Sequence, residues 1–110
     1  MIEVSLYFPE GNWNDDIDNK VIDKLRFAHK IKLPIIPEKG MFIVLDDFLC
    51  NYNFTIEEKI IFLNATRNEQ LTDEKDYLEY LESTHNWEWL EFEITHIFIH
   101  QEHLELWLKY

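Results

Sequence analysis

The chain has 110 residues, a formal net charge of −12 and a hydrophobic fraction of 46%. This length and apolar content predict a single folded domain spanning residues 1–110 and exclude global disorder. A lone cysteine, Cys50, excludes an internal disulfide, and no apolar run approaches the ~20 residues of a membrane helix. With no signal-peptide pattern at Met1–Phe8, we expect a protein of the bacterial cytoplasm that does not contact a membrane.

The first half of the chain is predicted to form three strands. Apolar and polar residues alternate over residues 2–8, and a short helical turn is expected over residues 15–21. Alternation returns over residues 24–33, which predicts a long strand ended by Pro34. The continuous apolar run at residues 41–45 is typical of a central, covered strand.

The second half begins with two predicted helices. Thr55 and Glu58 have capping-box spacing, so a helix should begin there and run to about Asn68. Thr72 is the predicted cap of the next helix. We expect the buried stripe of that helix to comprise Tyr77, Leu78 and Leu81.

Two further strands complete the predicted fold. The first spans about residues 87–100, and the second places Leu104, Leu106 and Leu108 on its core face. The predicted order is strand, strand, strand, helix, helix, strand, strand. We therefore expect an α+β fold with a mainly antiparallel sheet of about five strands and two helices packed on one face.

The acidic residues concentrate in residues 69–93, which hold nine acids against Lys75 alone and carry a net charge of −8. On a helix, acids three residues apart lie about 5–6 Å from each other on one face. Duplex DNA carries one negative charge per ~1.7 Å of its helix axis. A row of carboxylates could imitate that charge and occupy the basic channel of a nucleic-acid-binding protein. The alternative is a solvated face that keeps the protein soluble. The candidate partner-binding acids are Asp73, Asp76, Glu79, Glu82, Glu88, Glu91 and Glu93.

A basic set interrupts this acidity in the predicted strand at residues 24–33. Four cations lie on the face opposite the apolar side chains and could contact a nucleic-acid backbone. The alternative is pairing with carboxylates on neighbouring strands, such as Glu3, Glu91 or Glu93. The candidate nucleic-acid contacts are Lys24, Arg26, Lys30 and Lys32.

Tryptophans supply a second candidate binding surface. Trp87 and Trp89 lie two residues apart and would project to the same side of a strand, beside acidic residues. Tryptophan is enriched in interface hot spots, although the helical pair could instead cover these rings as core. Trp107 lies on the strand face opposite Leu106 and Leu108, and it too could be either a binding residue or part of the core. Trp13, in a polar turn, is expected to be exposed.

Sequence features of catalysis or metal binding are weak. The spacing of His96, His100 and His103 fits no established zinc pattern, and the two glycines cannot form a phosphate-binding loop. Cys50 is expected to be an inert thiol, and Asp46-Asp47 a turn or helix cap. We expect His29 to be a hydrogen-bonded core histidine. The prediction is a protein without catalytic residues, metal or cofactor.

In overall character the chain resembles the anti-CRISPR and DNA-mimic proteins, which are also small, acidic, cysteine-poor single domains. The resemblance concerns the whole chain rather than a motif. It implies a phage or mobile-element inhibitor whose partner is a basic protein or ribonucleoprotein, such as a CRISPR nuclease or its guide-RNA complex. The alternatives are an acidic immunity protein, a small subunit of a cellular complex, or an RNA binder using the basic set at residues 24–32.

Overall fold

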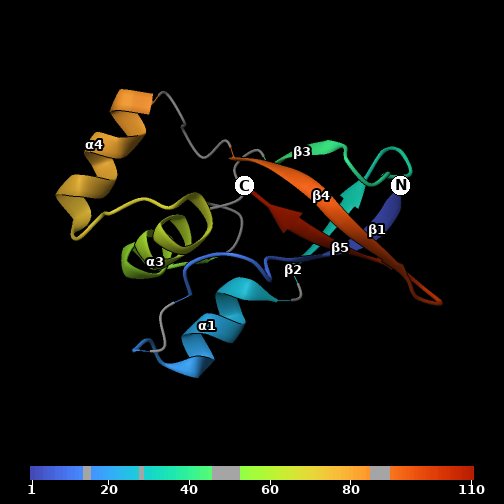
Figure 1. The fold of residues 1–110 in the computed structure, drawn as a ribbon, viewed down its shortest axis with the longest axis horizontal. Helices are drawn as coiled ribbons and strands as arrows, with labels where there is room; N and C mark the ends of the chain where they lie inside the picture. The colour runs from blue at the N-terminus through green and yellow to red at the C-terminus, as the bar shows by residue number, and fades with distance from the viewer. Residues whose placement is uncertain (14–15, 28, 46–52, 85–89) are drawn as a thin grey trace.

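A computed structural model describes residues 1–13, 16–27, 29–45, 53–84 and 90–110 of the chain. Within them, five strands form one sheet in the order β2-β1-β5-β4-β3, and helices gather at one end of it (Figure 1). The strands are β1 (Ile2–Tyr7), β2 (His29–Leu33), β3 (Phe42–Leu45), β4 (Leu90–Ile99) and β5 (Leu104–Lys109). The helices are α1 (Asn19–Arg26), α3 (Ile56–Arg67) and α4 (Glu74–Thr84).

The α+β class is confirmed, but the sheet is mixed. β1 and β5 pair in parallel, whereas the other neighbouring strands pair antiparallel. A parallel pair needs a long connection, and here almost the whole chain separates the first strand from the last. Three helices are described where two were predicted, so the element order differs from the expected one as well.

The additional helix replaces the first part of the predicted strand at residues 24–33. Asp18 caps α1, because its carboxylate accepts a hydrogen bond from the N–H of Lys20 at 2.9 Å. Ile22 and Leu25, three residues apart, are the buried side chains of the helix. The same leucine also fits the alternation of a strand, which is why the sequence pattern was misread. Only the residues from His29 onward form a strand.

The hydrophobic core lies between the inward face of the sheet and the helices. Val4 and Leu6 of β1 pack there with Leu106 and Leu108 of β5, as predicted from their alternation. The Phe8 ring contacts the rings of Phe62 on α3 and Phe92 on β4, with centroids 4.9 and 5.1 Å away. Helix α3 is thereby fixed against the centre of the sheet.

The start of α3 is as predicted. The N–H of Glu58 donates to the Thr55 hydroxyl at 3.1 Å, and the N–H of Thr55 donates to the Glu58 carboxylate at 2.9 Å. The helix ends at Asn68, whose φ of 57° is left-handed. Such a residue terminates many helices.

The predicted cap of α4 is wrong by one residue. The carboxylate of Asp73, not Thr72, accepts the N–H of Asp76 at 2.8 Å. The buried stripe of α4 also differs from the predicted one. Tyr77 and Leu81 are buried as predicted, and Tyr80 is buried in addition, whereas Leu78 is 50% exposed.

The prediction of a central, covered strand at residues 41–45 is also wrong. Among the residues that the structure describes, β3 lies at one edge of the sheet and pairs only with β4. Ile43 and Leu45 are buried, but Phe42 and Val44 are 64% and 40% exposed. A strand that is apolar on both faces therefore has one apolar face in solvent.

Candidate protein-binding surfaces

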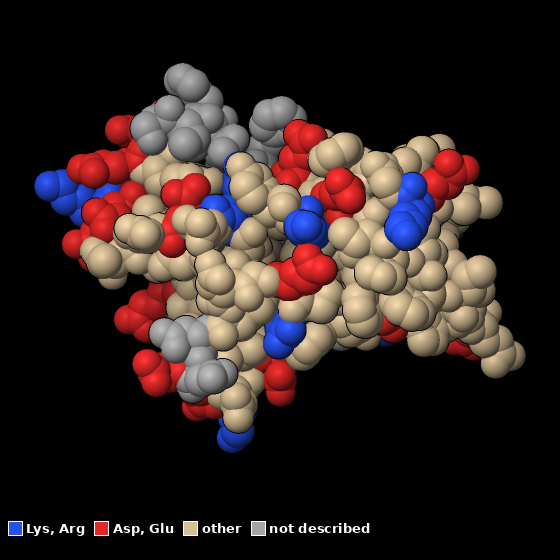
Figure 2. All heavy atoms as spheres, in the orientation of Figure 1, with Lys and Arg blue, Asp and Glu red and all other residues tan. Residues whose placement is uncertain are grey.

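The strongest concentration of negative charge lies over the helices. Glu57 of α3 and Glu74, Glu79 and Glu82 of α4 are exposed, and we call these four residues the acidic end. Figure 2 shows acidic side chains gathered over the helices, while the sheet end is mostly uncharged on this face. On this face, acidic side chains are therefore denser over the helices than over the sheet end.

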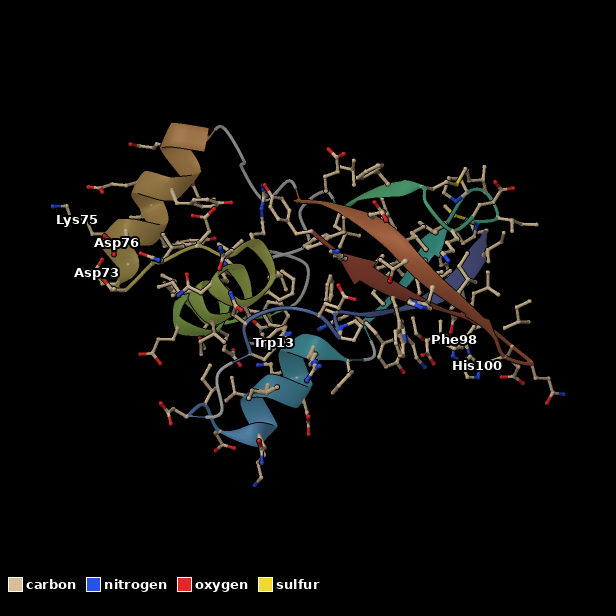
Figure 3. The ribbon with its side chains drawn as sticks, in the orientation of Figure 1. Trp13, Asp73, Lys75, Asp76, Phe98 and His100 are labelled. Carbon is tan, nitrogen blue, oxygen red and sulfur yellow. The ribbon has the colours of Figure 1, made fainter. Side chains whose placement is uncertain are left out.

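Two members of the predicted carboxylate row have local structural roles. Asp73 caps α4, and the Asp76 carboxylate accepts hydrogen bonds from the hydroxyl and the N–H of Thr72, at 2.6 and 2.9 Å. The Thr72 hydroxyl, followed by the Thr72 N–H, lowers the pKa of Asp76 below its usual value. Figure 3 shows both aspartates at the start of α4, with Lys75 extending away. These hydrogen bonds stabilise the start of α4.

The acids that follow on α4 have no cationic partner within the described part of the chain. There, the ion pairs with distances below 4 Å join Lys24 to Glu58, His100 to Glu105 and Lys109 to Glu10. The Glu58 carboxylate lies 2.8 Å from the Lys24 ammonium, whose hydrogen bond lowers the pKa of Glu58. Glu79 and Glu82 are in none of these pairs, so an outside partner can neutralise them.

The remaining predicted acids lie on another surface or outside the described residues. Glu91 is exposed and Glu93 is half-buried on β4, where they are the register partners of Val44 and Phe42 on β3. Glu88 lies outside the described residues. The acidic stretch thus divides between helix α4 and the outward face of the sheet.

The four basic residues predicted to share one strand face belong to two elements. Lys24 and Arg26 are on α1, and Lys30 and Lys32 are on β2. Arg26 donates to the Pro9 carbonyl, and its guanidinium lies 5.2 Å from the centroid of the Phe27 ring. The continuous basic strand on which the RNA-binding alternative depended is therefore absent from these described residues.

Trp13 is half-buried rather than exposed. Its indole N–H donates to the Phe8 carbonyl at 3.1 Å, and its ring packs edge-on to Phe62 with centroids 6.4 Å apart. It therefore packs the polar turn against the core. Trp87 and Trp89, like Cys50 and the Asp46-Asp47 pair, lie outside the described residues.

An aromatic cluster on the outward face of the sheet was not predicted as a unit. The centroid of the Trp107 ring on β5 lies 5.2 Å from that of the His96 ring and 5.0 Å from that of the Phe98 ring, both on β4. A register irregularity between Ile94 and His96 turns these two side chains to the same side as Trp107. The alternation around Trp107 indicated its face, but not the bulge that completes the cluster.

Hydrogen bonds attach this cluster to the β4–β5 turn. The two Glu105 oxygens bind the Trp107 indole N–H at 2.6 Å and His100 Nε2 at 3.0 Å. The His100 and His103 rings stack at 4.6 Å. Among the described residues, no three His, Cys, Asp or Glu side chains gather closely enough to hold a metal ion.

The prediction for His29 is confirmed. The side chain is buried, and its Nε2 lies 2.9 Å from the Leu25 carbonyl oxygen at the end of α1. Burial lowers the pKa of His29 below its ordinary value of 6.5, and the hydrogen bond to Leu25 opposes that shift. The residue joins α1 to β2.

Comparison of the chain with protein-family models, curated protein sequences and solved structures found no match. None of the helices in the described segments has the length and apolarity that crossing a bilayer requires. The candidate sites therefore depend on their own geometry and charge.

Proposed function

We propose that this chain is a non-catalytic inhibitor that binds a basic surface of a protein partner through the acidic end. The observation that supports this proposal is the run of exposed α4 carboxylates that form no ion pair with a described cationic residue. Carboxylates already neutralised within the fold would contribute little to recognition. Unpaired carboxylates gathered at one end raise the local negative potential and attract a cationic surface.

The target class that we propose is a bacterial nucleic-acid-handling enzyme, such as a CRISPR effector or its guide-RNA complex. These enzymes bind nucleic acid with basic channels, and an acidic protein surface can occupy such a channel. Because Asp73 and Asp76 are committed to the start of α4, the acidic end carries this role mainly through Glu74, Glu79 and Glu82. An acidic immunity protein would use the same surface against a basic toxin.

The test compares two variants with equal changes in charge. The first combines Glu74→Lys, Glu79→Lys and Glu82→Lys on α4, and the control combines Glu3→Lys, Glu38→Lys and Glu102→Lys away from it. Each protein is immobilised, exposed to lysate of a bacterial host, and its bound partners are identified by mass spectrometry. We expect the wild type and the control to retain a basic nucleic-acid enzyme.

The identified partner is then purified and titrated against all three proteins. The α4 variant should bind at least about tenfold more weakly, because each reversed charge at a charge-complementary interface costs on the order of 1 kcal/mol. Affinity of the wild type should fall as salt rises from about 50 to about 200 mM. Equal binding by the two variants would refute a role for the acidic end. Capture of a toxin would favour the immunity alternative.

A further inference from the structure

The two edges of the sheet differ in how they are protected from pairing with another strand. On β2, Lys30 and Lys32 are exposed, and charged side chains discourage the addition of a further strand. β3 and the preceding Met41 contain no charged residue, and Phe42 and Val44 are exposed. Only the β3 edge therefore has the composition of a strand-binding edge.

The register of β3 shows which backbone groups face outward. The Met41 carbonyl accepts the N–H of Ile94 at 2.8 Å, and Ile43 is paired with Phe92. In an antiparallel pair, alternate residues direct their N–H and C=O groups to the neighbouring strand. The N–H and C=O groups of Phe42 and Val44 consequently point away from β4, where an added strand would bind them.

A groove beside β3 can accept apolar side chains of such a strand. It has a volume of about 230 Å³. Its lining comes from the end of β2 and the loop after it, from β3 and the residue before it, and from β4: Leu33, Pro34, Ile35, Pro37, Met41, Phe42, Ile43, Val44 and Ile94. Strand addition commonly combines backbone hydrogen bonds with pockets for alternate side chains. The groove thus favours a strand with an apolar residue at every second position.

The outward face of the sheet beside β3 favours cationic residues at the positions of the added strand that lie between its apolar residues. Glu93 and Glu91 on β4 are the register partners of Phe42 and Val44. Lys109, the other register partner of Glu93, forms its ion pair with Glu10 instead, at 3.9 Å. A cationic side chain on an added strand would extend over the exposed Phe42 ring toward these carboxylates, which combines a cation–π contact with charge pairing.

We propose that β3 binds an extended segment of the basic partner in which apolar and cationic residues alternate. This inference rests on the proposed function and assigns the partner a second contact, separate from the acidic end. A second copy of the chain fits less well, because it would bring another net charge of −12 and an uncharged β3 edge.

The probe is a short synthetic peptide of alternating valine and arginine, titrated against the full chain by calorimetry. The control peptide has the same sequence, but the backbone nitrogens on the peptide edge that would pair with β3 are methylated. Methylation of every second nitrogen keeps the charge of the peptide and removes the N–H donors that would bind β3. We expect the methylated peptide to bind at least about tenfold more weakly. Equal affinity would show attraction by charge alone and would overturn the proposal.

Two sets of variants locate the peptide. Val44→Pro removes an N–H that points away from β4, so the β4 pairing remains, and peptide affinity should fall about tenfold relative to Val44→Ala. Neutralising Glu91 and Glu93 to glutamine should weaken binding several-fold more than neutralising Glu79 and Glu82, although both change the charge equally. The reverse order would overturn the proposal, and the peptide pair keeps the test valid if Val44→Pro fails to fold.

These outcomes are separable from those of the acidic end. If the peptide binds at β3 and the α4 variant still captures the partner as the wild type does, the proposed function of the acidic end is refuted. The inference that β3 binds a strand would then still stand. Loss of partner capture in the α4 variant with no discrimination between the two peptides would refute only the inference about β3. Dimerisation in sedimentation experiments that Val44→Pro abolishes would identify a second copy as the occupant, contrary to the proposal.

Discussion

Alanine substitution at the two glycines should destabilise the protein to very different extents. Gly11 has φ +139° and Gly40 has φ +90°, so a side chain strains the backbone at either position. A Cβ at Gly11 would also lie 2.4 Å from the backbone oxygen of Ala65 on α3, whereas a Cβ at Gly40 would meet nothing within 4 Å. The pair therefore separates backbone strain from steric overlap.

The expected magnitudes follow from these contacts. Backbone strain at positive φ costs about 1–2 kcal/mol at both positions. Relief of the overlap at Gly11 must move α3 or the turn, which costs a further ~1–3 kcal/mol. That movement also disturbs the hydrogen bond from the Asn12 N–H to the same Ala65 oxygen, now 2.9 Å long. We expect Gly11→Ala to cost about 2–5 kcal/mol and Gly40→Ala about 1–2 kcal/mol.

Urea unfolding followed by tryptophan fluorescence measures both losses. Trp13 should report the transition, because its half-buried ring packs on Phe62 and becomes exposed to solvent when the chain unfolds. Equal losses in the two variants, or a loss below about 1 kcal/mol for Gly11→Ala, would refute the close packing of this turn on α3. The acidic end would then lack one of its attachments to the sheet.

Three further predictions concern stability. Because burial lowers the pKa of His29 in the folded protein, the His29 side chain binds a proton more readily in the unfolded chain. The contribution of neutral, buried His29 to the free energy of unfolding is therefore complete above about pH 6.5, and it is lost as the pH falls from there toward the pKa of the folded state. Urea unfolding of His29→Leu between about pH 7 and pH 5 should therefore depend less on pH than that of the wild type, and parallel curves would contradict this. Thr55→Ala should destabilise the chain by about 1 kcal/mol, because the Glu58 N–H loses its acceptor, and an unchanged midpoint in urea would refute the cap. In thermal unfolding, Asp73→Ala should cost about 1 kcal/mol through loss of the α4 cap and Glu79→Ala less than about 0.5 kcal/mol; similar costs would show that the two acids do not differ in role.

Local patterns allowed several elements to be predicted correctly. The capping box at Thr55 depends on residues three apart, and the alternation in β1 and β5 depends on neighbours two apart. The burial of His29 likewise follows from its place in an apolar alternation. In each case the determining interactions lie within a few residues of one another, or depend only on which face of a strand is apolar.

Residues 19–27 and the start of α4 show the limit of such patterns. Leu25 fits both a strand alternation and a helical stripe, and packing of α1 on the core decides between them. The cap lies at Asp73 rather than Thr72, which commits two acids to the helix start, and the packing of α4 leaves Leu78 exposed. Composition alone could not show which carboxylates have a role within the fold.

The chain's acidity and its α+β class are determined by the amino-acid sequence itself, because they depend on composition and on local periodicity. The position of each strand in the sheet was decided only by the tertiary structure. Residues 41–45 are apolar enough for a central strand, but in the described sheet β5 pairs with β1 on one side and with β4 on the other, and β3 pairs with the far side of β4, which leaves β3 at the edge. Strand order depends on pairings between residues far apart in the chain, which no local pattern encodes. The same long-range pairings leave Phe42 and Val44 exposed, with Glu91 and Glu93 beside them.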